Sequence, residues 1–425
     1  MIVPVKYSES LKEEILTRRE SDAAAAEKTV KEIIGNVKKR GDAALYEYTR
    51  AFDKAELKDL KVGEEEIKAA LSATGEEYLS ILKTAAANIT AFHEKQLIKG
   101  FEMRIGGKIL GEKITPLACA GIYVPGGTAA YPSTVLMNAV PAKVAGVKKV
   151  VMTTPPDAEG KIGAAVLAAA AVAGVDEIYK IGGAQAIAAL AYGTESVPRA
   201  DKITGPGNIY VAAAKRHVFG AVGIDMIAGP SEILIIADGQ AKAEHVAADM
   251  LSQAEHDKLA SAVLVTDSET LARDVSAALE RRVKKLPRAA IAEISLKNNG
   301  KIIFANSLEE AAEISDALAP EHLELCVRDP FGLFERIHNA GSVFLGYNTP
   351  EAAGDYFAGT NHTLPTGGSA RYASALGAND FVKAVQYIRY DEETLKKEGA
   401  SIMAFARSEG LNAHAESLKV RLNDE

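Results

Sequence analysis

Apolar residues in the first part of the chain recur at helical spacing. From Leu11 to about Gln96 they return every three or four positions, as Ile15, Val30 and Val37 illustrate, and this period predicts amphipathic helices. Gly41 stands where a helix C-cap is expected. The entry to the chain is therefore predicted to be helical.

The pattern changes to alternation around residue 100. Phe101 to Ile105 and Lys108 to Glu112 flank a Gly106-Gly107 pair, and two alternating runs around such a pair predict a β-hairpin.

From Pro116 onward, apolar strand candidates alternate with Ala-rich helical stretches. The first series has strands at Ala118 to Val124, Val150 to Thr153, Glu177 to Ile181 and Gly223 to Ile227, with helices at 132–146, 160–174, 184–192 and 207–218. The second series has strands at Glu232 to Ala237, Ala262 to Thr266, Lys301 to Phe304, Leu323 to Val327 and Ser342 to Leu345. This alternation predicts an α/β fold: two tandem, Rossmann-like parallel-sheet units with smaller helical segments at both ends.

The last part of the chain begins with a polar, glycine-rich stretch. Residues from Thr349 to Ala373 show little apolar periodicity, and a long ordered loop of this kind is usually functional. A strand is expected at Phe381 to Ile388. From Asp391 helical patterning resumes, and this amphipathic tail is expected to pack on another domain or another subunit.

Composition narrows the class of protein. The chain has 425 residues, 48% of them hydrophobic and 25% charged, with a formal net charge of -8. These values describe a globular protein of two or three domains, and the negative charge argues against nucleic acid or an anionic membrane as a partner. The start lacks the order of a signal peptide, and the longest apolar run, Ile162 to Val175, is too short to span a bilayer. We therefore expect a cytoplasmic location. The chain has 2 cysteines, Cys119 and Cys326, too few for a disulfide framework.

Polar residues on an otherwise apolar helix face supply the first candidate chemistry. Gln253 and His256 are spaced so that an amide oxygen and an imidazole nitrogen can converge beside Val246 and Met250. A desolvated polar group without a partner costs roughly 1–3 kcal/mol, so half of a metal site and an ordinary polar helix end both remain open.

Glycine-rich turns offer a candidate nucleotide site. Such turns occur at Val124-Pro125-Gly126-Gly127-Thr128, Ile181-Gly182-Gly183-Ala184-Gln185 and Thr204-Gly205-Pro206-Gly207-Asn208. Each leads into a helical stretch, where backbone N–H groups can approach an anion. None has the Gly-x-Gly-x-x-Gly fingerprint, so the spacing leaves purely structural turns open as well.

Further acid and imidazole groups lie in the second half of the chain. Glu321-His322 at a strand entrance could act as a general base with a tuning carboxylate. Asp355 could complete a metal shell, since Zn²⁺ takes imidazole nitrogen and carboxylate oxygen. Cys326 could be a thiol nucleophile or an inert core residue. The remaining candidates are Ser231 for a polar substrate and Glu409 with His414 in the tail.

Taken together, these motifs resemble histidinol dehydrogenases. The motifs are Tyr123-Val124-Pro125-Gly126-Gly127, Gly182-Gly183-Ala184-Gln185-Ala186-Ile187, Gly205-Pro206-Gly207-Asn208, Ala228-Gly229-Pro230-Ser231-Glu232, Ser252-Gln253-Ala254-Glu255-His256-Asp257, Pro320-Glu321-His322-Leu323-Glu324 and Gly359-Thr360-Asn361-His362. Their joint occurrence in this order is specific, and the resemblance runs from the N-terminal helices to the tail.

The resemblance implies a set of site residues and partners. One Zn²⁺ per subunit would be held by Gln253, His256, Asp355 and His414, with His414 coming from the second subunit of a homodimer that exchanges its tails. Glu321 and His322 would be the catalytic pair. The substrate, L-histidinol, would be surrounded by Ser231, Gln253, His256, His322, Asp355, Glu409 and His414, and NAD would be contacted by Tyr123, Gln185 and Asn208. His362 receives no role.

The resemblance also implies a division of the chain. Residues 1–22 would be an N-terminal helical segment, and 23–115 with 230–378 would form an α/β domain that carries the metal and catalytic motifs. Residues 116–229 would form a second α/β domain with the NAD-contacting turns, and 379–425 a tail on the partner subunit.

The implied reaction is a four-electron oxidation of L-histidinol to L-histidine through L-histidinal with two NAD⁺, in the last steps of histidine biosynthesis. Three alternatives remain at this level: an aldehyde dehydrogenase with a Cys326 nucleophile, a zinc hydrolase in which Glu321 activates metal-bound water, and a non-catalytic dimer with structural zinc.

Overall fold

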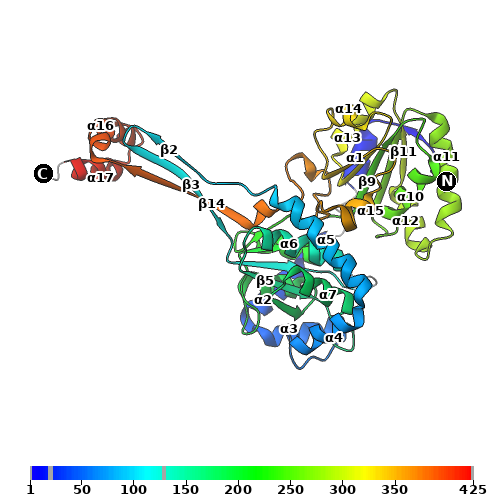
Figure 1. The fold of residues 1–425 in the computed structure, drawn as a ribbon, viewed down its shortest axis with the longest axis horizontal. Coiled ribbons are helices and arrows are strands. Elements are labelled where there is room, and N and C mark those ends of the chain that lie inside the picture. Colours follow the sequence, from blue (N-terminus) through cyan, green and yellow to red (C-terminus); the bar gives the residue numbers. More distant parts are fainter. Residues whose placement is uncertain (1, 18–22, 127–130, 423–425) are drawn as a thin grey trace. The chain divides into compact units, whose positions relative to one another are not determined.

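The chain has the predicted α/β architecture (Figure 1). The computed structural model describes residues 2–17, 23–126 and 131–422. These residues form two compact units, Met1–Gln96 with Leu117–Phe381 and Leu97–Pro116 with Val382–Glu425. None of the described helices is both long and apolar enough to cross a bilayer.

The larger parallel sheet of the first unit has six strands in the order β1-β11-β10-β9-β12-β13. The strands are β1 (Val5–Lys6), β9 (Glu232–Ala237), β10 (Ser261–Thr266), β11 (Lys301–Phe304), β12 (His322–Cys326) and β13 (Ser342–Leu345). The central strands are buried almost throughout because helices cover both faces. One face packs on α10 (Ala243–Ala254), α11 (Glu269–Val283) and α12 (Ala289–Asn299). The other packs on α1 (Glu9–Thr17), α13 (Leu308–Leu318) and α14 (Pro330–Phe334).

The smaller parallel sheet has five strands in the order β6-β5-β4-β7-β8. They are β4 (Cys119–Tyr123), β5 (Lys149–Thr154), β6 (Glu177–Lys180), β7 (Lys202–Thr204) and β8 (Gly223–Ile224). The chain winds outward from β4 in both directions, so a topological switch point lies between β4 and β7, where ligands bind in doubly wound sheets. The apolar pattern missed β7, which has only 3 residues.

The N-terminal helices pack on the smaller parallel sheet. α2 (Ala23–Arg40) contacts α8 (Gly183–Tyr192) and α9 (Ile209–Val218). α4 (Glu64–Thr74) contacts α7 (Ala164–Ala173), and α5 (Glu76–Glu94) contacts α6 (Pro132–Val144). The apolar face of α2 is buried in the core of the smaller parallel sheet, whereas α5 also contacts the π-helical turn η2 (Gly354–Ala358). The expected grouping of residues 23–115 with the metal-bearing sheet stays a prediction.

The second unit is an antiparallel sheet with a helix pair. Its strands β2 (Phe101–Ile105), β3 (Lys108–Pro116) and β14 (Val382–Tyr390) lie in the order β14-β3-β2. The predicted hairpin is confirmed, with Gly106 at a positive φ of 59° in its turn. α16 (Glu392–Ser408) and α17 (Asn412–Leu422) confirm the helical tail. Among the described residues of this unit only Gly111, Gly399 and Ala415 are buried.

Candidate active site

The candidate catalytic residues gather at the amino edge of the larger parallel sheet. His322 is the first residue of β12 and pairs in register with Ile233 of β9. α10 follows β9 and runs back toward the start of that strand, so its end returns to the same edge. Gln253, in the last turn of α10, is thereby brought beside His322, at 3.3 Å between Nε2 of Gln253 and Nδ1 of His322.

The glutamine and the two histidines form one connected polar group. Oε1 of Gln253 lies 2.8 Å from Nδ1 of His256, which stands just beyond the C-terminus of α10. Gln253 is fully buried. The convergence expected from the spacing of Gln253 and His256 is therefore present, and the group reaches His322 as well.

The neighbours of His322 define which ring nitrogen can accept a proton. Nδ1 lies 3.1 Å from the backbone oxygen of Glu232, which can only accept a hydrogen bond, so a hydrogen on Nδ1 satisfies this shorter contact, and the 3.3 Å approach of the Gln253 amide nitrogen is then no second hydrogen bond. Nε2 faces Oδ1 of Asp355 at 3.4 Å and is buried without a hydrogen-bond partner among the described residues. Nε2 thus points to the same place as the carboxylate of Asp355.

Glu321 is held on the other side of the ring. Its Oε2 accepts a hydrogen bond from the backbone N–H of Glu232 at 2.8 Å and lies 3.7 Å from Nδ1 of His322. The backbone N–H of Glu232 at the start of β9 therefore orients the carboxylate.

A third carboxylate, Glu351, was not anticipated. It belongs to the short helix α15 (Glu351–Ala353), which leads into the π-helical turn η2 (Gly354–Ala358) that carries Asp355. Oε1 of Glu351 lies 3.8 Å from Nε2 of His322, and its Oε2 is buried without a hydrogen-bond partner among the described residues. The signal in the sequence was its spacing, since residues four apart share a helix face.

Electrostatics at this edge are dominated by negative charge. Burial would lower the pKa of His322, but Glu351, Glu321 and Asp355 outweigh it and raise the pKa to about 10. Burial raises the pKa of Glu351 to about 7 despite the opposing effect of His322. This excess of buried carboxylate favours a bound cation.

Two further imidazoles border Asp355. Burial lowers the pKa of His256 and of His362, while the charge of Asp355 acts in the opposite direction on both. Neutral imidazoles are the form that binds a metal. His362, which received no role from the sequence, therefore belongs to the same group.

The remaining candidates are distributed over both units. Ser231 directly precedes β9 and is half-buried at the amino edge. Glu409 and His414 belong to the second unit, where both side chains are exposed.

The candidate cofactor residues gather at the carboxyl edge of the smaller parallel sheet. Tyr123 ends β4, and its hydroxyl accepts a hydrogen bond from the backbone N–H of Gly183 at 3.1 Å. Gln185, in the first turn of α8, is buried. Asn208 caps α9, and its Oδ1 accepts from the N–H groups of Tyr210 and Val211, which leaves its amide N–H₂ to contact a ligand.

Glycine is required where these turns meet. A Cβ on Gly126 or on Gly182 would lie 2.5 or 2.6 Å from Pro155, and one on Gly205 would lie 2.1 Å from the backbone oxygen of Tyr123. The backbones can pack this closely only without side chains. Gly127 and Thr128 of the first predicted turn lie outside the described residues.

A buried ion pair fixes the turn after β7. Lys215 of α9 pairs with Asp225, and both side chains are almost fully buried. Nζ of Lys215 donates to the backbone oxygen of Gly205 at 2.9 Å, and Oδ2 of Asp225 accepts from the N–H of the same glycine at 2.8 Å. The pair therefore holds both polar groups of one turn residue.

Comparison with known proteins gives a consistent result over nearly the whole chain. The family model described as histidinol dehydrogenase matches residues 16–422. The histidinol dehydrogenase of Geobacillus kaustophilus is 55% identical over 95% of both chains, and that of Syntrophotalea carbinolica is 54% identical over 96% of both. The crystal structure of histidinol dehydrogenase from Elizabethkingia anophelis is similar with a TM-score of 0.94 and 39% identity, covering 99% of this chain and 98% of that one.

The chain belongs to the histidinol dehydrogenase family. It is accordingly an NAD-dependent oxidoreductase of histidine biosynthesis, as the motifs predicted.

Histidinol dehydrogenase membership agrees with the surroundings of Cys326. The thiol is buried in β12, and its Sγ lies 3.9 Å from Oε2 of Glu324. Burial, together with the charges of Glu324 and Asp249, raises the pKa of this thiol far above its usual value. A thiolate nucleophile is therefore disfavoured at this position.

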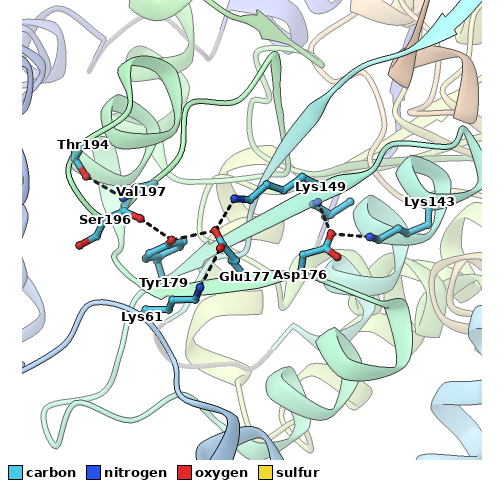
Figure 2. Close-up of polar contacts among 10 residues, drawn as sticks. Lys61, Lys143, Lys149, Asp176, Glu177, Tyr179, Thr194, Ser196 and Val197 are labelled. Carbon is cyan, nitrogen blue, oxygen red and sulfur yellow. Dashed lines mark hydrogen bonds and ion pairs between the residues drawn. The ribbon is translucent and has the colours of Figure 1, made fainter.

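A polar cluster at the opposite edge of the smaller parallel sheet is not a competing site (Figure 2). A cavity of about 360 Å³ lies there, beside the start of β5 and β6. Glu177 pairs with Lys61 at 2.9 Å and with Lys149 at 3.2 Å, and Asp176 accepts from Lys143. The acidic and basic side chains of this cluster are already paired with one another. The cluster therefore links the starts of β5 and β6 and leaves little uncompensated charge to bind a ligand.

Proposed function

We propose that this chain oxidises L-histidinol to L-histidine through L-histidinal, with two NAD⁺ consumed in succession. The observation that carries the proposal is the convergence of Gln253, His256, His322 and Asp355, from three separate segments, at one buried edge. We expect the reaction to take place in the cytoplasm.

The donor atoms at this edge are suited to a divalent cation. We propose that Gln253, His256 and Asp355, with the partner subunit's His414, hold one Zn²⁺ per subunit. Nε2 of His322 and Oε2 of Glu351 are buried and have no hydrogen-bond partner among the described residues, which supports the binding of a cation beside them. Oxygen and nitrogen donors are ligands of zinc. When bound, Zn²⁺ would fix the substrate through its imidazole and amino nitrogens.

His322 and Glu321 would move the protons. Nε2 of His322 would take the alcohol proton while the backbone oxygen of Glu232 holds Nδ1–H. The carboxylate of Glu321 would then activate water for addition to the aldehyde, and His322 would serve again as base in the second oxidation. Ser231 and Glu409 would help to enclose the substrate.

NAD⁺ would accept the hydride in each oxidation, and its binding would use the carboxyl edge of the smaller parallel sheet. We propose contacts with Tyr123, Gln185 and Asn208. The support is their meeting at glycine-rich turns beside the switch point of the sheet.

The decisive assay follows NADH absorbance after L-histidinol and NAD⁺ are added. We expect steady NADH formation by the wild type and by His338→Asn, whose ring is exposed and bonded to Asp316. His322→Asn should lower the rate by about 10³-fold. Product formation without NAD⁺, or equal rates in all three proteins, would contradict the proposal.

The metal has its own test. Chelation should abolish NADH formation while circular dichroism retains most of its amplitude, because the cores of the two parallel sheets are built from apolar side chains and include none of the proposed ligands. Zinc should restore the rate. Unfolding on chelation would instead indicate a structural metal.

We propose that the protein is a homodimer whose tails are exchanged. In the second unit, large apolar side chains such as Phe101, Ile388 and Phe405 are exposed, and no described side chain larger than alanine is buried. A three-stranded sheet without a core is marginal in water, so a partner surface is needed to cover it.

Mixing two inactive variants tests the exchange. His256→Asn and His414→Asn should each lose metal and activity. If the tail of one subunit completes the site of the other, a mixed dimer holds one intact site, and random reassociation should restore roughly a quarter of wild-type activity. No recovery after verified subunit mixing would place His414 in its own subunit's site or outside it.

The division of the chain into folding domains also stays a proposal. Separate expression of residues 116–229, with and without the N-terminal helices, would test whether these helices are needed for that sheet to fold.

A further inference from the structure

Asp53 presents a buried carboxylate oxygen that nothing in the described chain satisfies. The residue ends the π-helical turn η1 (Thr49–Asp53), which follows α3 (Asp42–Tyr48). The next residue, Lys54, has a left-handed φ of 62°. Oδ2 of Asp53 is buried and has no hydrogen-bond partner among the described residues. Local strain and an unsatisfied buried acceptor are both typical of functional positions.

The carboxylate of Asp53 acts through its charge on Tyr123, the last residue of β4. The pKa of Tyr123 is raised to about 12, mainly by burial and further by the charge of Asp53. Thr153 of β5 pairs in register with Tyr123 and therefore shares its face of the sheet. Its hydroxyl is also buried without a described partner. Two unsatisfied polar groups thus border the tyrosine that we propose as an NAD contact.

The two basic residues close to Asp53 in the chain, Lys54 and Arg50, already have other partners. Nζ of Lys54 donates to the backbone oxygen of Ala51 at 2.7 Å, and Arg50 pairs with Glu56 at 3.4 Å. Burial alone raises the pKa of Asp53 to about 6. The site therefore favours a neutral hydrogen-bond donor and opposes an added anion.

A vicinal diol fits these requirements. Each of its hydroxyls can donate to one carboxylate oxygen, and hydrogen bonds to a charged acceptor are stronger than those between neutral groups. The glycine-rich turns after β4 and β6 pack closely on Pro155 through Gly126 and Gly182, and they lead toward helices whose first N–H groups can bind a diphosphate. A ribose beside a diphosphate has this combination of groups.

We propose that Asp53 accepts hydrogen bonds from a ribose of the bound dinucleotide and repels a ribose that carries a 2′-phosphate, so that the enzyme selects NAD⁺ over NADP⁺. This inference rests on the proposed NAD site and assigns the residue that sets its cofactor specificity.

The test compares Asp53→Asn and Asp53→Ser with a matched control, Asp59→Asn, an exposed carboxylate of the same segment. Steady-state rates are measured with NAD⁺ and NADP⁺ at saturating L-histidinol. Both Asp53 variants should raise the KM for NAD⁺ by about 10-fold and lower the NAD⁺ to NADP⁺ preference at least as much. The KM for L-histidinol and the zinc content should stay unchanged, and Asp59→Asn should match the wild type.

Thermal unfolding without nucleotide separates this role from a structural one. Because Asn replaces a desolvated charge that has no described partner, Asp53→Asn should raise the Tm by roughly 2 °C, whereas loss of a structural contact would lower it.

An unchanged KM for NAD⁺ and an unchanged cofactor preference in both variants would overturn the inference while leaving the dehydrogenase intact. A wild type that reduces no NAD⁺ with L-histidinol would instead refute the proposed function. Isothermal titration with NADH and NADPH then decides the inference independently of turnover, since the Asp53 variants should weaken only NADH.

Discussion

The two parallel sheets of the first unit carry their candidate functional residues at opposite edges. In the larger sheet the candidate catalytic residues lie at the amino ends of β9 and β12, where Glu321 and His322 meet Asp355. In the smaller sheet the candidate cofactor turns follow the carboxyl ends of β4, β6 and β7, beside Tyr123 and Gly183.

The contrast between the edges is chemical as well as topological. The catalytic edge is crowded with buried charge, and the backbone N–H and C=O of Glu232 orient the side chains of Glu321 and His322. The cofactor edge is built from glycine turns that pack closely on Pro155 and on the backbone of Tyr123. A parallel sheet can therefore support proton transfer at its amino edge and cofactor binding at its carboxyl edge, because exposed strand-end groups orient side chains while glycine turns admit a ligand.

The largest predicted effect is a loss of activity that distinguishes His322 from Glu321 at the catalytic edge, which we also call the charged edge. We expect His322→Asn to slow both oxidations by about 10³-fold, since the same nitrogen accepts a proton in each. Glu321→Gln should slow mainly the oxidation of L-histidinal, which needs water. Stopped-flow NADH formation from L-histidinol and from L-histidinal distinguishes the steps.

A Glu321→Gln enzyme that is slowed equally with both substrates would show that the carboxylate acts through His322 in each step. The exposed His338 and its half-buried partner Asp316 provide matched controls, His338→Asn and Asp316→Asn.

The next largest effect is on the stability of the cofactor edge of the smaller sheet, which we also call the glycine-built edge. Lys215→Met leaves the buried carboxylate of Asp225 without its cation, and we expect a loss of about 3–5 kcal/mol in the free energy of unfolding. The double variant Lys215→Met/Asp225→Leu should recover much of the lost free energy of unfolding, because it buries neither charge. Denaturant titration measures both.

The double variant also shows whether the pair serves the cofactor. It should still bind NADH more weakly than the wild type, because Gly205 loses both side-chain partners. Wild-type NADH affinity in a stable double variant would mean that the turn holds its shape unaided.

A smaller effect distinguishes the two possible ligand sets of the charged edge. Donor atoms of His322, Glu351 and Asp355 all lie within 4.8 Å of one another, whereas the proposed set uses Gln253, His256 and Asp355. Glu351→Gln should lower kcat by about 10-fold with the metal retained, since it alters the charge around His322 without removing a proposed ligand. Loss of zinc from this variant would make Glu351 a ligand.

Local patterns were sufficient to predict most of the fold. The continuous apolar runs of β9 and β11 were predicted at their observed bounds, because buried parallel strands are apolar on both faces. β7 escaped because Lys202 to Thr204 is too short for a period to show.

Long-range placement was less predictable. The spacing of Gln253 and His256 is local, so their convergence could be expected. Asp53 could not be singled out, and Glu351 only by its spacing from Asp355, because a carboxylate looks alike in sequence whether it is solvated or buried. The packing of α2 on α8 and α9 was equally hidden, since an amphipathic helix shows which face is apolar but not which sheet receives it.

The smallest predicted effect is a pH dependence at the glycine-built edge. The pKa of Asp53 is about 6 in the folded protein and near 3.8 when exposed. The folded state thus holds this proton more tightly. The resulting stability is fully present below pH 3.8 and is lost as the pH rises toward 6, where the buried carboxylate ionises. Asp53→Asn removes this loss, so its Tm advantage over the wild type should be largest above about pH 7 and should shrink toward pH 5. Because the side chain is only half-buried, solvent screening keeps the advantage to a few degrees. Calorimetric scans at matched ionic strength, with Asp59→Asn as the control, measure the difference. A Tm advantage independent of pH would mean that the carboxylate of Asp53 is solvated, and the charged edge would then be the only one at which this enzyme buries an uncompensated carboxylate.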